Sequence, residues 1–257
     1  MTDGGGRLVI LSGPSCVGKS PLFHSLGRFY PELAGRLRKL VLVNSRGPRP
    51  GEADGVDYHF RTRAQIEALR ADSRYAVLEA RSDLQAVDVE ELVSWLARGD
   101  VLFEGNPYVG RALQAHAGLA GVKRLSIFVS PLSQEEIIYL KDAARNVSLS
   151  EFVADVMRRK LLRRTMRQKQ ILSAKDLEEI EIRAGSAYRE LQEAWHFDHV
   201  IVNHDGEDSE NWDAFHYLIG DARRTLAAFA GLLQDVVGDG VEKWEGDLLP
   251  STARLKS

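Results

Sequence analysis

A glycine-rich turn between an apolar run and a helical pattern places the strongest constraint on this fold. Residues 8–12 (LVILS) form a short apolar run that predicts a buried strand. Residues 13–20 (GPSCVGKS) follow, and apolar side chains then recur at helical spacing through residues 19–35. The turn matches the pattern G-x-x-x-x-G-K-[ST] in full, in the strand–turn–helix context that the pattern requires. It predicts a βαβ unit with a loop built to hold phosphate.

Each part of the turn has a chemical role in this interpretation. The glycines let several N–H groups point inward, and these dipoles bind anions together with the N-terminus of the following helix. Lys19 is expected to reach the β- and γ-phosphates of a nucleoside triphosphate, and the Ser20 hydroxyl to bind Mg²⁺. The residues expected to bind ATP are Gly13, Pro14, Ser15, Cys16, Val17, Gly18, Lys19, Ser20 and Pro21.

Two residues of the turn raise questions about its chemistry. Pro21 has no backbone N–H, so a contact to the inner phosphate is lost, although its fixed φ suits the first turn of a helix. We therefore expect weaker nucleotide binding without loss of phosphoryl transfer. The Cys16 thiol would have a lowered pKa if inward N–H groups surrounded it; the alternative is a small residue that fills a loop position.

The rest of the chain alternates strand and helix patterns. This alternation predicts an α/β fold with a mainly parallel sheet covered on both faces. The expected strands cover residues 39–45, 75–82, 100–105, 124–131 and 197–205. The expected helical segments cover residues 62–72, 87–99, 134–193 and 211–237, and a loose tail follows Gly238.

The composition fits a soluble globular protein and excludes several other classes. The 257 residues are 44% hydrophobic and 28% charged, and the net charge of −3 gives no global attraction to nucleic acid or membrane. A single cysteine leaves no intrachain disulfide. No apolar run approaches the roughly 18 residues of a membrane span, and the N-terminus lacks a secretory signal. The expected location is the cytoplasm.

A second motif lies at residues 46–60 (RGPRPGEADGVDYHF), where two arginines stand three residues apart. Two guanidinium groups so placed can hold one phosphate dianion, and Tyr58 can donate a further hydrogen bond. The alternative is a solvated, salt-bridged turn. The segment resembles the acceptor-binding motif of guanylate kinases, R-x-P-R-x-G-E-x-x-G-x-D-Y-x-F. The resemblance covers about residues 7–205, with a poorly matching stretch at 141–177.

The resemblance implies a set of acceptor-binding residues. Arg46, Arg49 and Tyr58 would hold the monophosphate of the acceptor, and Glu79 would accept hydrogen bonds from a guanine edge. Glu104 is a candidate for organising Mg²⁺ together with Ser20. The acceptor-binding residues expected in full are Arg46, Arg49, Glu52, Tyr58, Glu79, Glu104 and Asn106.

The sequence departs from the guanylate kinase pattern where the base is read. Leu42 stands where the family has a serine, and SDLQAVD at residues 82–88 replaces G-N-Y-Y-G-T. Lost hydrogen-bond partners for a buried polar edge reduce discrimination. We therefore expect GMP to be discriminated from AMP or IMP less sharply than in typical guanylate kinases. The polar residues available as replacements are Asn44, Ser45, Asp83, Gln85 and Asp88.

A basic segment at residues 157–170 (MRRKLLRRTMRQKQ) contains no acidic residue. The resemblance implies a helical lid that closes over the triphosphate, and it assigns Arg163, Arg167 and Arg183 as the arginines that offset developing charge. The alternative is a solvated face or an RNA-contacting patch. Residues 141–156 look inserted relative to the family and would enlarge the lid or form an oligomer contact.

Together these features predict a P-loop kinase with one domain over residues 1–237. The expected core covers 1–40, 98–140 and 190–237, the acceptor-binding arm 41–97 and the lid 141–189, and residues 238–257 form a C-terminal tail.

The expected reaction is transfer of the γ-phosphoryl group from ATP–Mg²⁺ to a nucleoside monophosphate, with GMP or dGMP as first choice. Lys19, Arg163, Arg167 and Arg183 are the expected catalytic residues. One alternative is a kinase for another phosphorylated metabolite or base-modified nucleotide. The other is a non-catalytic guanylate-kinase-like module that binds a phosphorylated ligand. The expected partners are nucleotide substrates rather than membrane or nucleic acid, and a homo-oligomer remains open.

Overall fold

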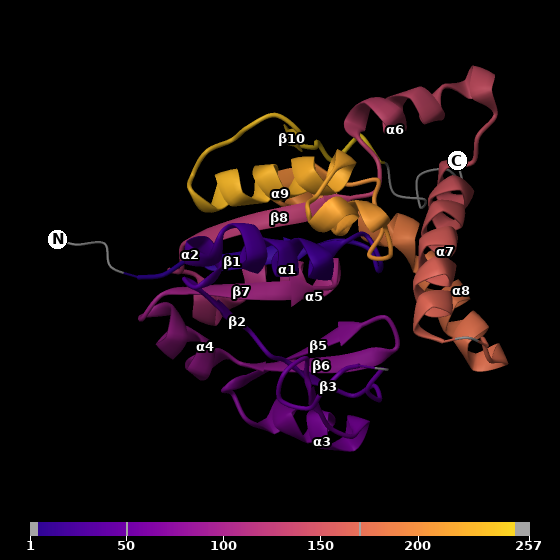
Figure 1. The fold of residues 1–257 in the computed structure, drawn as a ribbon. Coiled ribbons are helices and arrows are strands. Elements are labelled where there is room, and N and C mark those ends of the chain that lie inside the picture. Colours follow the sequence, from indigo (N-terminus) through magenta and orange to yellow (C-terminus); the bar gives the residue numbers. More distant parts are fainter. Residues whose placement is uncertain (1–4, 50, 170, 250–257) are drawn as a thin grey trace. The chain divides into compact units, whose positions relative to one another are not determined.

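The structure, a computed structural model, describes residues 5–49, 51–169 and 171–249. Its strands form a six-stranded sheet in the order β10-β9-β8-β1-β7-β2 and a four-stranded sheet in the order β4-β3-β6-β5 (Figure 1). In the larger sheet β2 pairs with β7 and β8 with β9 in parallel, whereas β10 is antiparallel to β9. The predicted α/β fold with a mainly parallel central sheet is confirmed.

The elements have the following bounds. The strands are β1 (Leu8–Ser12), β2 (Leu37–Lys39), β3 (Val43–Asn44), β4 (His59–Phe60), β5 (Tyr75–Ala80), β6 (Asp83–Asp88), β7 (Asp100–Gly105), β8 (Arg124–Ser130), β9 (His199–Val202) and β10 (Val241–Glu242). The α-helices are α1 (Lys19–Phe29), α2 (Pro31–Ala34), α3 (Arg63–Ala68), α4 (Val89–Leu96), α5 (Pro107–Ala115), α6 (Gln134–Lys141), α7 (Leu149–Gln168), α8 (Ala174–Leu191) and α9 (Gly220–Leu233).

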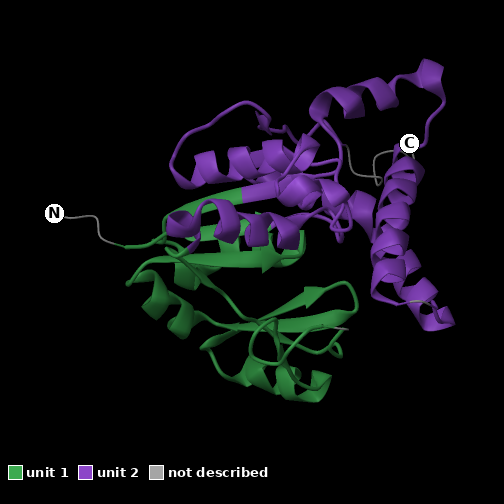
Figure 2. Ribbon diagram, in the orientation of Figure 1, with its two compact units in different colours: residues 1–11, 35–126 green, residues 12–34, 127–257 purple. Residues whose placement is uncertain are grey.

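The chain divides into two compact units, which Figure 2 shows in different colours. Unit 1 comprises the N-terminal residues up to 11 together with 35–126, and unit 2 comprises 12–34 together with the chain from 127 onward. Unit 1 therefore contains the arginine motif and the four-stranded sheet, and unit 2 contains the glycine-rich turn and the basic segment.

In unit 1 the four-stranded sheet packs one face against α3. Helix α3 begins at Thr62, whose side chain accepts a hydrogen bond from the Gln65 N–H, while the Gln65 side chain accepts one from the Thr62 N–H. This capping box satisfies backbone donors that the first helical turn leaves open. Ile66 of α3 is fully buried against Leu84 and Ala86 of β6. The alternation of side chains along β6 therefore decides which residues face α3 and which face the other way.

In unit 2 helices α7 and α8 lie side by side and form the charged helical segment expected from the sequence (Figure 1). Both are predominantly polar, and α7 buries Val153, Met157 and Leu161 along one stripe. Helix α9 buries an apolar face that includes Leu226 and Phe229. These stripes have the helical spacing that packs one side of a helix and leaves the other to solvent.

Some sequence-based expectations about the elements are wrong. The helix expected at 211–237 begins at Gly220, because the chain before it forms short 3₁₀ turns with Phe215 at a positive φ of 52°. The tail is not loose over residues 238–249, since β10 pairs with β9 and Trp244 is 1% exposed. The expected strand at 39–45 is split between β2 and β3, which belong to different sheets. Among the described residues, no helix is both long and apolar enough to cross a membrane.

Candidate active site

The glycine-rich turn of unit 2 has a backbone that only glycine fits at two positions. Gly13 and Gly18 have φ values of +153° and +104°, which side-chain-bearing residues rarely adopt. A Cβ at Gly13 would lie 2.4 Å from the Val129 carbonyl oxygen, and one at Gly18 would lie 2.4 Å from Nδ2 of Asn203. The turn is therefore held close to neighbouring segments, as a rigid loop for anions requires.

The residues after Gly18 form the start of α1. Lys19 is buried, and its Nζ donates hydrogen bonds to the carbonyl oxygens of Gly13 and Pro14 at 2.9 and 2.8 Å. Lys19, Ser20 and Pro21 are the first three residues of the helix, with Gly18 at the N-cap. The helix N-terminus, the ammonium and the Ser20 hydroxyl thus come together at one end of the turn, as the sequence motif predicts.

Asn203, directly after β9, fixes the turn from outside. Its buried Nδ2 donates hydrogen bonds of 2.7 Å to the carbonyl oxygens of Val17 and Asp205, and its Oδ1 accepts one from the Asp205 N–H. Asp205 in turn accepts hydrogen bonds from Asn211 Nδ2 and from the N–H of Ala222 in α9. The sequence analysis did not identify this support. The signal was the polar run after a core strand, VNHD.

Cys16 lies in the turn, is 1% exposed and has a left-handed backbone with φ of 67°. Burial raises the pKa of its thiol to about 12, and the Glu207 carboxylate acts in the same direction, whereas Arg164 and Arg183 oppose it. The interpretation of Cys16 as a thiol with a lowered pKa is therefore wrong. The side chain is a small buried group that fills the loop, which was the alternative.

The arginines expected in the lid have different surroundings. Arg183 of α8 and Arg164 of α7 both act electrostatically on the Cys16 thiol, so both lie within reach of the turn. Arg163 and Arg167 are exposed, and Arg167 pairs with Glu210 at 3.4 Å. The structure therefore brings Arg183 toward the turn together with Arg164, which the sequence analysis did not choose. Arg164 follows Lys160 by four residues on α7, so helical spacing places these two cations on one face of the helix.

Acidic partners offset much of the basic segment. Arg158 binds Glu181 of α8 at 2.7 Å, and Arg164 binds Glu207 at 2.9 Å. Lys169 pairs with Asp176 of α8. A segment neutralised in this way offers little excess charge to a phosphate backbone, so these contacts favour a structural or lid role over an RNA-contacting patch.

In unit 1 the arginine motif is organised around Glu52. The Glu52 carboxylate accepts hydrogen bonds of 2.6 Å from both terminal nitrogens of Arg46 and one of 2.8 Å from the Arg49 N–H. Burial opposes the charge on Glu52, but these bonds outweigh it and the pKa of Glu52 is lowered. Burial likewise opposes the charge on Arg46, and its bonds to Glu52 keep the pKa of Arg46 raised. Both groups are therefore charged, and Glu52 orients Arg46 rather than binding an anion itself.

Tyr58 lies beside this pair. The Arg46 guanidinium is 4.9 Å from the centre of the Tyr58 ring and 5.7 Å from that of Phe60. Burial raises the pKa of Tyr58, while Arg46 and Arg49 lower it and Glu104 raises it further. The phenol is thus neutral and can donate a hydrogen bond, with both arginines and Glu104 within electrostatic reach.

Two further expected acceptor residues, Asn106 and Glu79, have defined places in unit 1. Asn106 is the N-cap of α5, where its Oδ1 accepts a hydrogen bond from the Tyr108 N–H at 2.9 Å. Glu79 has a side chain that is 71% exposed and lies 3.9 Å from Arg70. Glu79 pairs with Leu84 across the β5–β6 hairpin, so it shares the face of the sheet that packs on α3. The structure therefore does not bring Glu79 to the opposite face.

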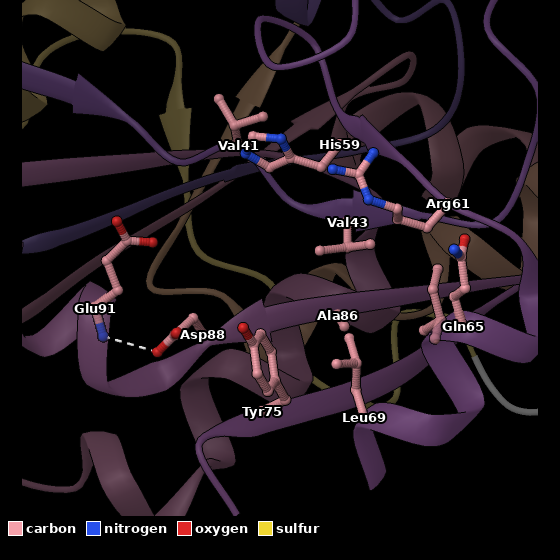
Figure 3. A pocket seen from close by; sticks show the side chains of 11 residues that line it. Val41, Val43, His59, Arg61, Gln65, Leu69, Tyr75, Ala86, Asp88 and Glu91 are labelled. Carbon is pink, nitrogen blue, oxygen red and sulfur yellow. Dashed lines mark hydrogen bonds between the residues drawn. The ribbon is translucent and has the colours of Figure 1, made fainter. Parts of the chain in front are cut away.

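A pocket of about 440 Å³ lies on that same α3-facing side of the sheet (Figure 3). Val43, Ala86 and Leu69 contribute apolar lining, and polar side chains surround them. Some of these polar groups serve local structure. Asp88 accepts a hydrogen bond from the Glu91 N–H as the N-cap of α4, which Figure 3 shows as a dashed line, and Arg61 donates to the Phe60 carbonyl oxygen. The residues that line the pocket do not include Arg46, Glu52 or Tyr58.

These features define a class of protein. A glycine-rich turn with a buried lysine at a helix N-terminus has the form of a triphosphate-binding loop, and the charges of the Arg46–Glu52–Tyr58 cluster suit a second phosphate. The chain has the architecture of a P-loop phosphotransferase that acts on a phosphorylated acceptor.

Comparisons with known proteins identify the family. A sequence profile described as "Guanylate kinase" matches residues 5–84. A guanylate kinase of Nocardia farcinica is 30% identical over 199 residues, which is 77% of this chain and 86% of the relative. One from a Mycobacterium species is 36% identical over 166 residues, 62% of this chain and 75% of the relative. One from Rickettsia bellii is 28% identical over 211 residues, 81% of this chain and 92% of the relative.

A solved structure supports the fold. The crystal structure of guanylate kinase from Anaplasma phagocytophilum has a TM-score of 0.51 and 18% sequence identity, and the match covers 91% of this chain and 87% of that one. The chain belongs to the guanylate kinase family and is a nucleoside monophosphate kinase. The relationships do not favour the two alternatives, a kinase for another metabolite and a non-catalytic binding module.

Proposed function

We propose that this protein transfers the γ-phosphoryl group of ATP to GMP or dGMP, with the turn at residues 13–20 as donor site and the Arg46–Glu52–Tyr58 cluster as acceptor site. The observation that carries the proposal is the presence, in one guanylate kinase chain, of both an intact phosphate-binding turn with a buried Lys19 and an ordered, charged arginine cluster. Loss of the turn would abolish binding of the phosphoryl donor, and loss of the arginine cluster would abolish binding of the acceptor.

The donor residues act by placing positive charge around the triphosphate. The N–H groups of the turn and the start of α1 would bind the β- and γ-phosphates, and Lys19 would exchange its carbonyl partners for phosphate oxygens. Arg164 and Arg183, both within electrostatic reach of Cys16, would offset charge on the migrating group. Arg163 and Arg167 remain the candidates from the family resemblance for contacts made by a closing lid over residues 141–189.

The Ser20 hydroxyl fits Mg²⁺, because this ion takes oxygen ligands and is held by few protein groups together with substrate phosphates. Ser20 is the second residue of α1, beside the Lys19 ammonium. When bound there, Mg²⁺ would neutralise the outer phosphates of ATP. Glu104 remains a second candidate for organising the ion.

The acceptor residues act by position and charge. Arg46 donates through both terminal nitrogens to Glu52 and also to the Gly47 carbonyl oxygen, so its guanidinium is held in place and would face the acceptor phosphate as a fixed charge. Arg49 and the neutral Tyr58 phenol would complete the phosphate contacts. The arm at residues 41–97 would carry the acceptor, and an enzyme that consumes ATP and a monophosphate would act in the cytoplasm, where both are available.

A panel of nucleoside monophosphates with ATP–Mg²⁺, followed as ADP release, tests the proposal. We expect GMP and dGMP to be the best acceptors, and Lys19→Met to abolish transfer while GMP binding by calorimetry is retained. Arg159→Met is a matched control, because this exposed cation of α7 lies outside both clusters. ADP release that is independent of every monophosphate, or equal in Lys19→Met, would refute the proposal.

A further inference from the structure

Gln85 is a largely buried polar side chain whose amide makes no hydrogen bond with any group in the described part of the chain. It lies in the middle of β6 and is 7% exposed. The Gln85 amide is not among the fully enclosed side-chain polar atoms that lack a partner, so it is open at the surface and can form hydrogen bonds to a ligand.

The pairing of the strands places Gln85 on the face opposite to α3. Gln85 pairs with Leu78 on one side and with Asn44 on the other, and Asn44 pairs with Phe60 of β4. Residues paired across strands share a face of the sheet, so these four form one row. Glu79 and Leu84 belong to the other face.

This row leads to the acceptor cluster. At its β4 end, the Phe60 ring lies 5.7 Å from the Arg46 guanidinium and 6.0 Å from the centre of the Tyr58 ring. Asn44 is also joined directly to the cluster, because its Oδ1 accepts a hydrogen bond from the Arg46 N–H at 3.1 Å. A monophosphate held by Arg46 and Tyr58 would therefore have the Asn44 and Gln85 amides on the adjoining part of the same face.

The contact to Arg46 also fixes which way the Asn44 amide points. A backbone N–H can only donate, so the Asn44 oxygen must face Arg46 and the Asn44 Nδ2 must point away as a donor. Nδ2 has no partner of its own within the described chain. Asn44 is 1% exposed, so the surrounding atoms hold its side chain in this orientation. The neighbouring Gln85 amide is unconstrained and can present its oxygen as an acceptor.

We propose that Asn44 and Gln85 read the base of the acceptor, with Asn44 Nδ2 donating to O6 and Gln85 Oε1 accepting from N1–H of a 6-oxopurine. This assignment rests on the proposed function, since GMP as acceptor fixes which purine edge meets the pair. AMP in the same pose would set its 6-amino group against the Asn44 donor and its unprotonated N1 against the Gln85 oxygen. The pair does not touch the 2-amino group, so it treats GMP and IMP alike.

The first test measures binding without ATP. Calorimetric titrations would use GMP, IMP, AMP and ribose 5-phosphate, which carries the phosphate without a base. We expect GMP and IMP to bind more tightly than AMP and ribose 5-phosphate in the unchanged protein. Gln85→Met, which keeps volume and removes both polar atoms, should weaken GMP and IMP by the same factor of about tenfold or more and leave ribose 5-phosphate unchanged.

Gln65→Met is the matched control. It makes the same substitution on α3, on the other face of the sheet, and although it removes the Gln65 half of the capping box it should leave all four affinities of the folded protein unchanged. An unchanged ratio of GMP to ribose 5-phosphate in Gln85→Met would overturn the assignment.

A second variant keeps the test decisive if Gln85→Met does not fold. Asn44→Asp still accepts the hydrogen bond from Arg46 but replaces the Nδ2 donor by an acceptor. It should weaken GMP and IMP and strengthen AMP, a gain that damage to the fold cannot produce. No shift toward AMP would refute the role of Asn44.

The outcomes separate this inference from the proposed function. Base-dependent binding that responds to both variants, without ADP release, would refute kinase activity and leave the base assignment standing. Active enzyme with unaltered base preference in both variants would refute the base assignment alone. Absence of binding by all four ligands would refute both.

Discussion

Lys160 is a buried cation whose removal should stabilise the protein. The side chain lies on α7, is 8% exposed, and places its Nζ 3.5 Å from the Asn203 carbonyl oxygen, which is a long contact. Burial lowers the pKa of Lys160 to about 8, and the surrounding groups Cys16, Asp205, Asp208 and Glu136 oppose this without reversing it. We predict that Lys160→Met, a change of similar length without charge, raises the free energy of unfolding at neutral pH.

The expected magnitude follows from proton linkage. Lowering the pKa from 10.5 to about 8 corresponds to about 3 kcal/mol, which is the upper limit of the gain. Below pH 8 both folded and unfolded chains carry the proton, so the full cost is present. Between pH 8 and 10.5 the unfolded chain holds more protons than the folded one, so the unfolding free energy of the unchanged protein rises with pH. The advantage of Lys160→Met should therefore be largest at pH 7 and vanish near pH 10.5.

Chemical denaturation at pH 7 and pH 10 would measure this difference, because other groups that titrate in alkali are common to both proteins and cancel. Arg159→Met, the exposed neighbouring cation, should change the unfolding free energy by less than about 0.5 kcal/mol at either pH. A Lys160→Met protein that is less stable at pH 7 would refute the reasoning, since the ammonium would then gain more from nearby carboxylates than burial costs. A cation beside the turn also favours bound phosphate, so we expect weaker ATP binding in the variant.

Three further predictions concern substrate binding and acid stability. Arg49→Ala should raise the KM for the acceptor about ten- to a hundredfold and leave the KM for ATP unchanged, since a charged hydrogen bond is worth about 1.5–3 kcal/mol; a loss of ATP affinity instead would contradict the arm assignment. Pro21→Thr should tighten ADP binding about tenfold by calorimetry, and an unchanged affinity would show that the turn compensates. Because the pKa of Glu52 is lowered in the folded protein, its carboxylate adds to the free energy of unfolding above about pH 4.5, and this contribution is lost as pH falls. Glu52→Gln should reduce the fall of the unfolding free energy between neutral and acid pH, measured by denaturation. An unaltered dependence on pH would exclude Glu52 as its source.

The parts of the fold and site that depend on local chemistry were predictable from the sequence. The turn at residues 13–20, the Thr62 cap and the buried strands each follow from a short pattern whose physical cause lies within a few residues. The Arg46–Glu52 pairing was not predicted, since Glu52 was expected to bind the acceptor, although a salt-bridged turn was named as the alternative for the two arginines. The expected weak discrimination of GMP from IMP or AMP stays a prediction.

The parts that depend on distant partners were not predictable. Asn203 contacts the turn at Val17, a residue 186 positions away in the sequence, and the polar run that contains Asn203 does not indicate which segment it will contact. The position of Arg164 beside Arg183 depends on the packing of α7 on α8, whereas the family resemblance favoured Arg163 and Arg167. The role of Glu79 stays a prediction, and the face it occupies could not be predicted, because a one-residue difference in register moves a side chain to the other face of a hairpin.

The Asn203 contact also explains how the turn keeps its shape with Pro21 in place. The fold of the turn is set by the positive φ values of Gly13 and Gly18, by the Asn203 bond to Val17 and by burial, all of which act on residues before Pro21. Proline in the first turn of α1 removes an N–H that has no partner within the helix, so α1 forms at no cost in internal hydrogen bonding. What proline removes is therefore a donor for a bound anion rather than a support of the fold. Nucleotide affinity can thus be tuned at residue 21 while the turn itself stays intact.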